Sequence, residues 1–381
     1  MKKKLQDGVK PHPWIKKKST KIAIIIVAVL LALLTIVGSA VYLFAKGKVD
    51  KLDQVEIDTS SLGVSENEVL TGYRNIAILG LDTRGDSYGT GNRSDNMIIA
   101  SINNDTNEVK LISVYRDSYL RIEGHGLDKA THAYSYGAAQ ATLKMLNENL
   151  DLNITEFVTV NFESVIEAVD AVGGVSIPIT SEEVYHMNGY IKELNSLFGK
   201  SSKQITAAGT HTLDGVQALA YARIRYTAGG DYKRTERIRD VLTAIVDKLK
   251  TKSLLEINSF IDKMLPMIST NLKMSDFVSM IPVLTSFNIT ESIGWPYDKF
   301  TKTINGISYV IPDTLEEGVR RLHVEAFGDT DYVVPDNVKE ISQAIIASAG
   351  STYRPPVSSS SSKTEESSKP LEDTSSKTSD N

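Results

Sequence analysis

The sequence predicts a mixed α/β domain, in which a central β-sheet is flanked by helices, preceded by one transmembrane helix. The membrane helix is predicted by residues 22–45, which carry no charge and exceed the about 20 apolar residues needed to cross a bilayer. The α/β class is predicted because short β-branched runs alternate with stretches whose apolar residues recur at helical spacing. The chain has no cysteine, which excludes disulfides and thiolate metal sites.

The flanks of the apolar segment predict its orientation. Residues 1–21 contain eight lysines and a single aspartate, so they are expected to stay in the cytoplasm as a basic tail. Residues 22–45 then form a signal anchor, and the protein is a single-pass protein of the cell membrane with its C-terminal domain extracellular. A cleaved signal peptide ending near Gly38-Ser39-Ala40 is the alternative, but its apolar region would be longer than the usual one of about 7–15 residues.

The remainder divides by composition. Residues 46–70 are polar and are predicted to form an extracellular stalk. Residues 71–350 are long enough for one large extracellular domain. Residues 351–381 are a tail rich in Ser, Lys and Glu, which is expected to be disordered because it offers almost no apolar surface to bury.

Three apolar runs open the domain, at 75–81, 96–102 and 108–115, and each is predicted to be a strand. The turn cluster 103–107 separates the last two. Further along, the expected elements are a helix at about 130–149, a strand at 156–162, a helix from Phe162 ending at Gly173-Gly174, and a strand at 175–179. Residues 181–210 are interpreted as loop and short helix, and 251–350 as further packed structure without a chemical signature.

A meander of the first three strands would gather charged residues at one edge of the sheet. These residues are Asp82, Arg84, Arg93, Asp95, Arg116 and Asp117. Carboxylates suit a hard cation such as Mg²⁺, which keeps several waters and shares a substrate phosphate. Guanidinium groups suit phosphate oxygens, which they bind as a fork.

A second cationic segment lies far along the chain, "RIRYTAGGDYKRTERIRD" at 223–240. Arg223 and Arg225 would point to the same side of an extended piece. A helix is expected to begin near Asp231, with Arg234 and Arg237 in its first turns, where the helix dipole disfavours cations. A bound anion would resolve that conflict. Lys129 is either a further cation of this site or a lysine in solvent.

Other chemistries find no support in the sequence. The six histidines have no metal-ligand spacing, and neither a Walker loop nor a Gly-x-Ser-x-Gly motif is present. The chain has a net charge of −5 and its basic N-terminal tail leaves the rest more acidic still, so no nucleic-acid partner is expected. Taken singly, any one of these arginines fits a surface ion pair better than a ligand site, and the functional interpretation rests on two distant segments that supply the same chemistry.

Five ordered blocks within about 75–250 resemble the LytR-CpsA-Psr family. They are "LGLDTR…GNRSDNMII" (79–99), "SVYRDSYLRI" (113–122), "DKATHAYSYGAA" (128–139), "VNFESVIEAVDAVGGV" (160–175) and "LDGVQALAYARIRYTAGGDYKRTERIR" (213–239). The resemblance implies a Mg²⁺-dependent phosphotransferase that moves a glycopolymer, of the teichoic acid or capsular polysaccharide class, from a polyprenyl-pyrophosphate carrier to peptidoglycan.

The resemblance also implies residue roles. Asp82 and Asp95 would bind Mg²⁺ (or Mn²⁺) and, with Arg116, form the catalytic set. The substrate-binding cations would be Arg84, Arg93, Lys129, Arg223, Arg225, Arg234 and Arg237. Three positions depart from the family pattern, with Tyr115 for Pro, Lys233 for Gly and Ile238 for a Gln that holds phosphate. A lipid-pyrophosphate phosphatase using water, and a membrane-linked transcriptional regulator, are the alternative functions.

Overall fold

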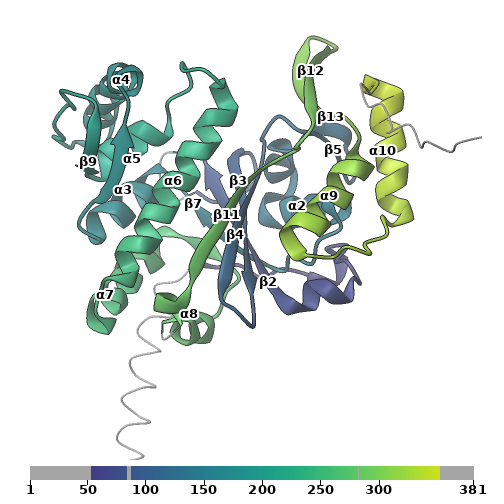
Figure 1. Cartoon of the computed structure of the whole chain (residues 1–381), viewed down its shortest axis with the longest axis horizontal. Helices are drawn as coiled ribbons and strands as arrows, with labels where there is room; N and C mark the ends of the chain where they lie inside the picture. The colour runs from purple at the N-terminus through teal and green to yellow at the C-terminus, as the bar shows by residue number, and fades with distance from the viewer. Residues whose placement is uncertain (1–52, 84–86, 282, 352–381) are drawn as a thin grey trace, which may run out of the picture. The chain divides into compact units, whose positions relative to one another are not determined.

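The computed structural model describes residues 53–83, 87–281 and 283–351 (Figure 1). The predicted N-terminal tail, the predicted anchor and the C-terminal tail lie outside the described residues, as does Arg84. Within those described ranges, no helix combines the length and the apolar character needed to cross a membrane.

A mixed sheet forms the centre of the described chain. Its seven strands in the described ranges run in the order β1 (Asp53–Gln54), β10 (Ser269–Thr270), β7 (Glu156–Val160), β2 (Tyr73–Leu81), β3 (Ser94–Asn103), β4 (Glu108–Val114) and β11 (Asn288–Trp295). The predicted meander is confirmed, because β3 pairs antiparallel with β2 on one side and with β4 on the other. The parallel neighbours β7 and β11 extend this meander on either side.

Helices cover both faces of the sheet (Figure 1). One face carries α2 (His132–Leu150), α9 (Leu315–Phe327) and α10 (Asp336–Ala349), whose apolar side chains share one core with the sheet. The other face carries α6 (Gly230–Lys250), and beyond it α3 (Phe162–Ala171), α4 (Ser181–Phe198) and α5 (Gly215–Ala222) form a second apolar cluster. Along β3, Met97 and Ile99 enter the first core while Ile98 and Ile102 face α6.

Smaller elements complete the fold. Among the described residues, three antiparallel pairs lie outside the main sheet: β5 (Tyr119–Ile122) with β6 (Gly126–Lys129), β8 (Val175–Ile179) with β9 (Gly209–Leu213), and β12 (Lys299–Ile304) with β13 (Ile307–Pro312). The remaining helices are α7 (Leu254–Met264), α8 (Met274–Met280), η1 (Thr59–Ser61), η2 (Glu68–Gly72), η3 (Leu265–Met267) and η4 (Leu284–Ser286).

Two sequence-based expectations differ from the structure. Residues 53–70 do not form a stalk, because β1 pairs with β10, and Leu62 and Leu70 are fully buried in the first core. Two isolated leucines in a polar segment give no periodic signal. Residues 181–198 form one long helix, α4, which begins with a capping box between Thr180 and Glu183.

Candidate active site

Three strand ends bring the first predicted site residues together. Asp82 follows β2, Asp95 lies at the start of β3 and Arg116 follows β4. Arg116 Nη1 lies 2.6 Å from Asp95 Oδ2, and Asp95 is only 8% exposed. The Thr131 N–H, just before α2, donates to the Arg116 carbonyl (3.0 Å). This hydrogen bond holds the backbone of Arg116 in place after β4 ends. The sheet edge therefore holds an ion pair between a half-buried arginine and a buried aspartate, and the meander correctly predicts that these residues share one edge.

The second cationic segment joins the same pair. Arg225 Nη2 and Arg234 Nη1 lie 3.5 Å and 3.7 Å from Asp95 Oδ2. Asp231, in the first turn of α6, lies 3.2 Å from Arg234, 3.7 Å from Arg225 and 3.7 Å from Arg116. We call Arg116, Arg225 and Arg234 with Asp95 and Asp231 the arginine cluster. It carries three positive and two negative charges. In the sequence analysis Asp231 marked only the expected start of this helix.

The arginine cluster is short of acceptors for its donors. Burial works against the charge of Arg116, but Asp95, Asp231 and Asp117 outweigh it and raise the pKa of this guanidinium. Arg234 differs, because burial together with the charges of Arg225 and Arg116 lowers its pKa. The Nε atoms of Arg116 and Arg234 lie 3.7 Å and 3.2 Å from Asp231, but neither forms a well-oriented hydrogen bond within the described chain. An anion with several oxygens would supply the missing acceptors.

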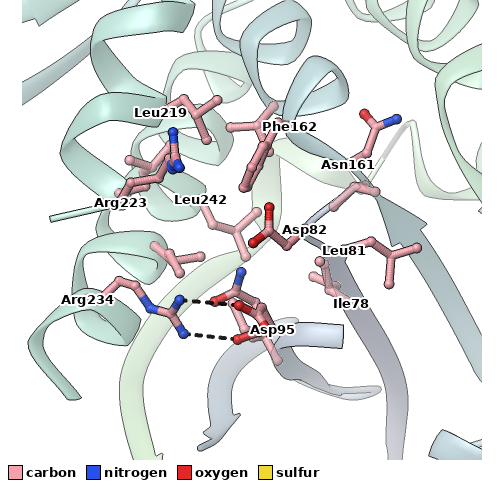
Figure 2. A pocket seen from close by; sticks show the side chains of 18 of the residues that line it. Ile78, Leu81, Asp82, Asp95, Asn161, Phe162, Leu219, Arg223, Arg234 and Leu242 are labelled. Atoms are coloured by element: carbon pink, nitrogen blue, oxygen red, sulfur yellow. Dashed lines mark hydrogen bonds and ion pairs between the residues drawn. The ribbon is translucent and has the colours of Figure 1, made fainter. Parts of the chain in front are cut away.

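An apolar cavity of about 260 Å³ opens beside the cluster (Figure 2). Its walls come from the sheet, including Ile78 and Ile98, and from α6, including Ile238 and Leu242. Asp82 and Asp95 line the same cavity, and Figure 2 shows the Asp82 side chain between Phe162 and Asp95. Charge at the rim above apolar walls suits an amphiphilic ligand with a phosphate headgroup.

Arg223 lines the same cavity as Arg234, and Figure 2 shows it near Leu219. It is the C-cap of α5 and has right-handed helical backbone angles, so it is not part of an extended piece as predicted. Its guanidinium carbon lies 5.1 Å and 5.0 Å from the ring centroids of Phe162 and Tyr190. Its Nη1 lies 3.1 Å from Glu193. Arg223 and Arg225 nevertheless both line the cavity.

Lys129 connects to the cluster indirectly. Its Nζ lies 2.7 Å from Asp117, and Asp117 in turn lies 3.7 Å from Arg116 Nε. Arg93 is exposed before β3. The hydrogen bond from Tyr136 to Asp128 raises the pKa of Tyr136, and the nearby charge of Arg93 partly opposes that rise. Lys129 and Arg93 are not among the residues that line the cavity.

Arg237 does not line the cavity. It is 2% exposed, and its Nε donates to Glu183 Oε1 (2.9 Å). Its other donors reach the Ile224 carbonyl (3.1 Å) and Thr227 Oγ1 (2.7 Å). Arg237 therefore fastens the loop that carries Arg225 to α4 and α6, and does not itself face the cavity.

The donor set constrains any metal. Among the described residues, no group of three or more His, Asp or Glu side chains could enclose an ion. Asp82 and Asp95 line one cavity, and two carboxylates fit Mg²⁺ when water and substrate phosphate complete its shell. The pair therefore suits a metal that arrives with its substrate.

Comparisons with known proteins match this geometry. A polyisoprenyl-teichoic acid–peptidoglycan teichoic acid transferase, TagT of Bacillus subtilis (strain 168), is 32% identical over 74% of this chain and 89% of its own length. The solved structure of TagT bound to LIIa-WTA is 30% identical, with a TM-score of 0.56 over 71% of this chain and 95% of that one.

A further solved structure, the family protein YwtF (TagT) with bound octaprenyl pyrophosphate lipid, is 28% identical. Its TM-score is 0.51, over 70% of this chain and 94% of that one. The model of the LytR_cpsA_psr family matches residues 40–319, which is most of the sequence. The chain therefore belongs to the LytR_cpsA_psr family.

Proposed function

We propose that this chain is a membrane-anchored phosphotransferase that moves a glycopolymer of the teichoic acid class from a polyprenyl-pyrophosphate carrier to peptidoglycan. The observation that carries the proposal is the apolar cavity that opens at the arginine cluster. The named activity of the TagT relative and the octaprenyl pyrophosphate in the YwtF structure support it.

Each part of the substrate has a matching surface. The polyprenyl tail would lie against Ile78, Ile98 and Leu242 in the cavity. The diphosphate would accept hydrogen bonds from the guanidinium groups of the arginine cluster. Asp82 and Asp95 would hold Mg²⁺ (or Mn²⁺), which neutralises charge on the diphosphate when bound.

The reaction is a displacement at phosphorus. A sugar hydroxyl of peptidoglycan forms a bond to the phosphorus that bears the polymer, while the bond from that phosphorus to the bridging oxygen breaks. Polyprenyl phosphate leaves with additional negative charge, which Arg116, Arg225 and Arg234 stabilise. The hydroxyl proton passes to a carboxylate or to water. Positioning and charge neutralisation thus supply most of the catalysis.

The membrane placement belongs to the same proposal. Residues 22–45 would anchor the chain with residues 1–21 in the cytoplasm, so that the cavity faces the lipid carrier outside the cell. A reporter active only in the cytoplasm, fused to the C-terminus, is expected to be silent. Activity of that reporter would contradict this topology and favour a regulator.

Arg116→Ala is expected to lower transfer by about 10²–10³-fold, because one preorganised charge partner of the leaving phosphate is lost. Purified full-length protein is mixed with lipid-linked polymer and peptidoglycan, and transferred polymer is measured with Mg²⁺ and after its chelation. Arg320→Ala, which removes an exposed ion pair with Glu317 on α9, is the matched control and should keep activity.

Two outcomes would overturn the proposal. Near-normal transfer by Arg116→Ala would remove the cluster from catalysis. Release of free polymer at the same rate with and without peptidoglycan would identify a phosphatase that uses water. Full activity after chelation would remove the metal from the mechanism while leaving the transfer assignment in place.

A further inference from the structure

A second hollow lies beside the mouth of the cavity, between α4 and the loop that follows α5. We call it the aromatic groove and define it by Tyr185, His186, Tyr190, Tyr226, Lys192 and Glu193. We infer that the aromatic groove binds the sugar units joined to the diphosphate of the lipid-linked glycopolymer. This inference rests on the proposed function.

The groove is continuous with the cavity. Tyr190 and Tyr226 line both hollows. Tyr226 directly follows Arg225, which lies 3.5 Å from Asp95 in the arginine cluster. On the α4 side, Glu193 lies 3.1 Å from Arg223, which lines the cavity. A sugar attached to a diphosphate at the cluster would therefore reach the groove without leaving the protein surface.

The side chains of the groove suit a polyol. Tyr185 is 79% exposed and Tyr226 is 72% exposed, whereas exposed aromatic residues elsewhere are usually single and scattered. His186 lies between them, with ring centroids 5.2 Å from Tyr185 and 5.8 Å from Tyr226. Aromatic faces of this kind accept the C–H faces of sugar rings, while the phenol and imidazole groups hydrogen-bond to hydroxyls.

The charge of the groove favours a sugar over a membrane surface. Lys192 and Glu193 bring one charge of each sign to the lining, and Glu193 also lies 3.1 Å from Arg223. Binding to anionic lipid would require a cluster of basic side chains, and Lys192 is the one Lys or Arg among the described residues that line this groove. A neutral or weakly charged glycan matches that balance.

The same placement favours the donor over the acceptor. In-line displacement requires the attacking hydroxyl to approach phosphorus opposite the leaving polyprenyl phosphate. Because the groove shares Tyr190 and Tyr226 with the tail cavity, it lies on the side of the leaving group. The sugar already bonded to phosphorus can lie there, whereas the incoming peptidoglycan hydroxyl approaches from elsewhere.

The test uses the full-length protein and two synthetic lipids, octaprenyl diphosphate and the same lipid carrying a disaccharide on its diphosphate. Tyr185→Ala is expected to weaken binding of the disaccharide lipid by about three- to tenfold and to leave binding of the sugar-free lipid unchanged. His186→Ala should act in the same direction. Leu255→Ala removes an equally exposed apolar side chain, on α7, and should change neither affinity.

Each other result has a definite meaning. Equal affinities for wild type and Tyr185→Ala, or an equal loss for both lipids, would overturn the inference. A raised KM for peptidoglycan with unchanged donor affinity would assign the groove to the acceptor. Weaker binding of Tyr185→Ala to phosphatidylglycerol vesicles, with both lipid affinities unchanged, would assign it to the membrane. If wild-type protein binds neither lipid, the proposed function fails, and that result is independent of Tyr185.

Discussion

The two faces of the central sheet are covered by helices in different ways. Beneath α2, α9 and α10, side chains such as Leu143, Leu146 and Val319 have no exposed surface and fill the space. Beneath α6, Ile78, Ile98 and Leu242 line a cavity whose rim carries the arginine cluster. Both faces are apolar, but one is complete within the described chain and the other is open to a ligand.

The face under α6 contributes less to the stability of the fold than the face under α2, α9 and α10, because it keeps a cavity for a ligand. Atoms that line an empty cavity lose dispersion contacts on one side. Three guanidinium groups share two carboxylates at its rim, and the lowered pKa of Arg234 reflects burial together with the charges of Arg225 and Arg116. The filled face contributes the stability that allows the open face to remain incomplete.

Among the variants considered, Arg237→Ala is expected to have the largest effect, with a loss of about 3–5 kcal/mol in the free energy of unfolding. Burial tends to raise the pKa of Glu183, but its hydrogen bonds from Thr180 and its pairing with Arg237 outweigh burial and lower it. Removing Arg237 therefore leaves a buried carboxylate without its counter-charge. Chemical denaturation measures the loss.

A double variant tests the cause of that loss. Arg237→Met combined with Glu183→Gln removes both charges and retains an oxygen for the cap of α4, so it should be more stable than Arg237→Ala. If the single variant unfolds like wild type, or the double variant is no better, the buried pair does not fasten the loop.

A pair of leucine truncations compares the two faces directly. Leu146→Ala in the filled core is expected to lower the free energy of unfolding by about 2–5 kcal/mol, because a new cavity forms. Leu242→Ala should cost only about 1 kcal/mol, because Leu242 is only partly buried at the cavity wall. Leu242→Ala should in addition weaken binding of octaprenyl diphosphate. Equal destabilisation by the two variants would contradict the contrast.

The smallest expected effect concerns pH and the filled face. Burial lowers the pKa of His323 below 6.5, against the opposing charges of Asp151 and Asp329. The unfolded chain therefore binds this proton more readily, so stability should fall as pH drops below 6.5 and level off below the folded pKa.

The loss expected from this histidine between pH 7.5 and pH 5.5 is about 1 kcal/mol. Denaturation curves at the two pH values measure it, and His323→Gln is the control that should show a smaller difference. An identical pH dependence in wild type and His323→Gln would show that this histidine does not bind the additional proton on unfolding.

The sequence predicted those strands and helices whose apolar residues form a clear local pattern. Strands at 75–81, 96–102 and 108–115 are confirmed within a residue or two, because each is a short apolar run bounded by polar turns. Helix α4 was missed although Met187, Ile191 and Leu194 recur at helical spacing, since Gly189 and many polar residues interrupt the pattern. The buried Leu62 has no periodic neighbours and could not be found.

For the candidate site, the sequence could predict which residues lie at the same edge of the sheet. Pairing rules placed Asp95 beside Arg116, and the structure has them 2.6 Å apart. Spacing along α6 could not distinguish Arg234, which faces the cavity, from Arg237, which turns to Glu183. That distinction depends on where α4 packs, and α4 comes from the segment whose structure was not recognised.

The pairing of β11 with β4 has a consequence for how this domain can be divided or recombined. The two strands run side by side from Asn288 opposite Glu108 to Trp295 opposite Val114. The Tyr115 N–H then donates to the Trp295 carbonyl, next to Arg116. A fragment that stops at residue 250 would keep the five sequence blocks that resemble the family. It would lose β11, whose hydrogen bonds to β4 align the block that contains Arg116. Chimaeras between relatives should therefore exchange β4 and β11 together, because the hydrogen bonds between these two strands position the residues that follow β4.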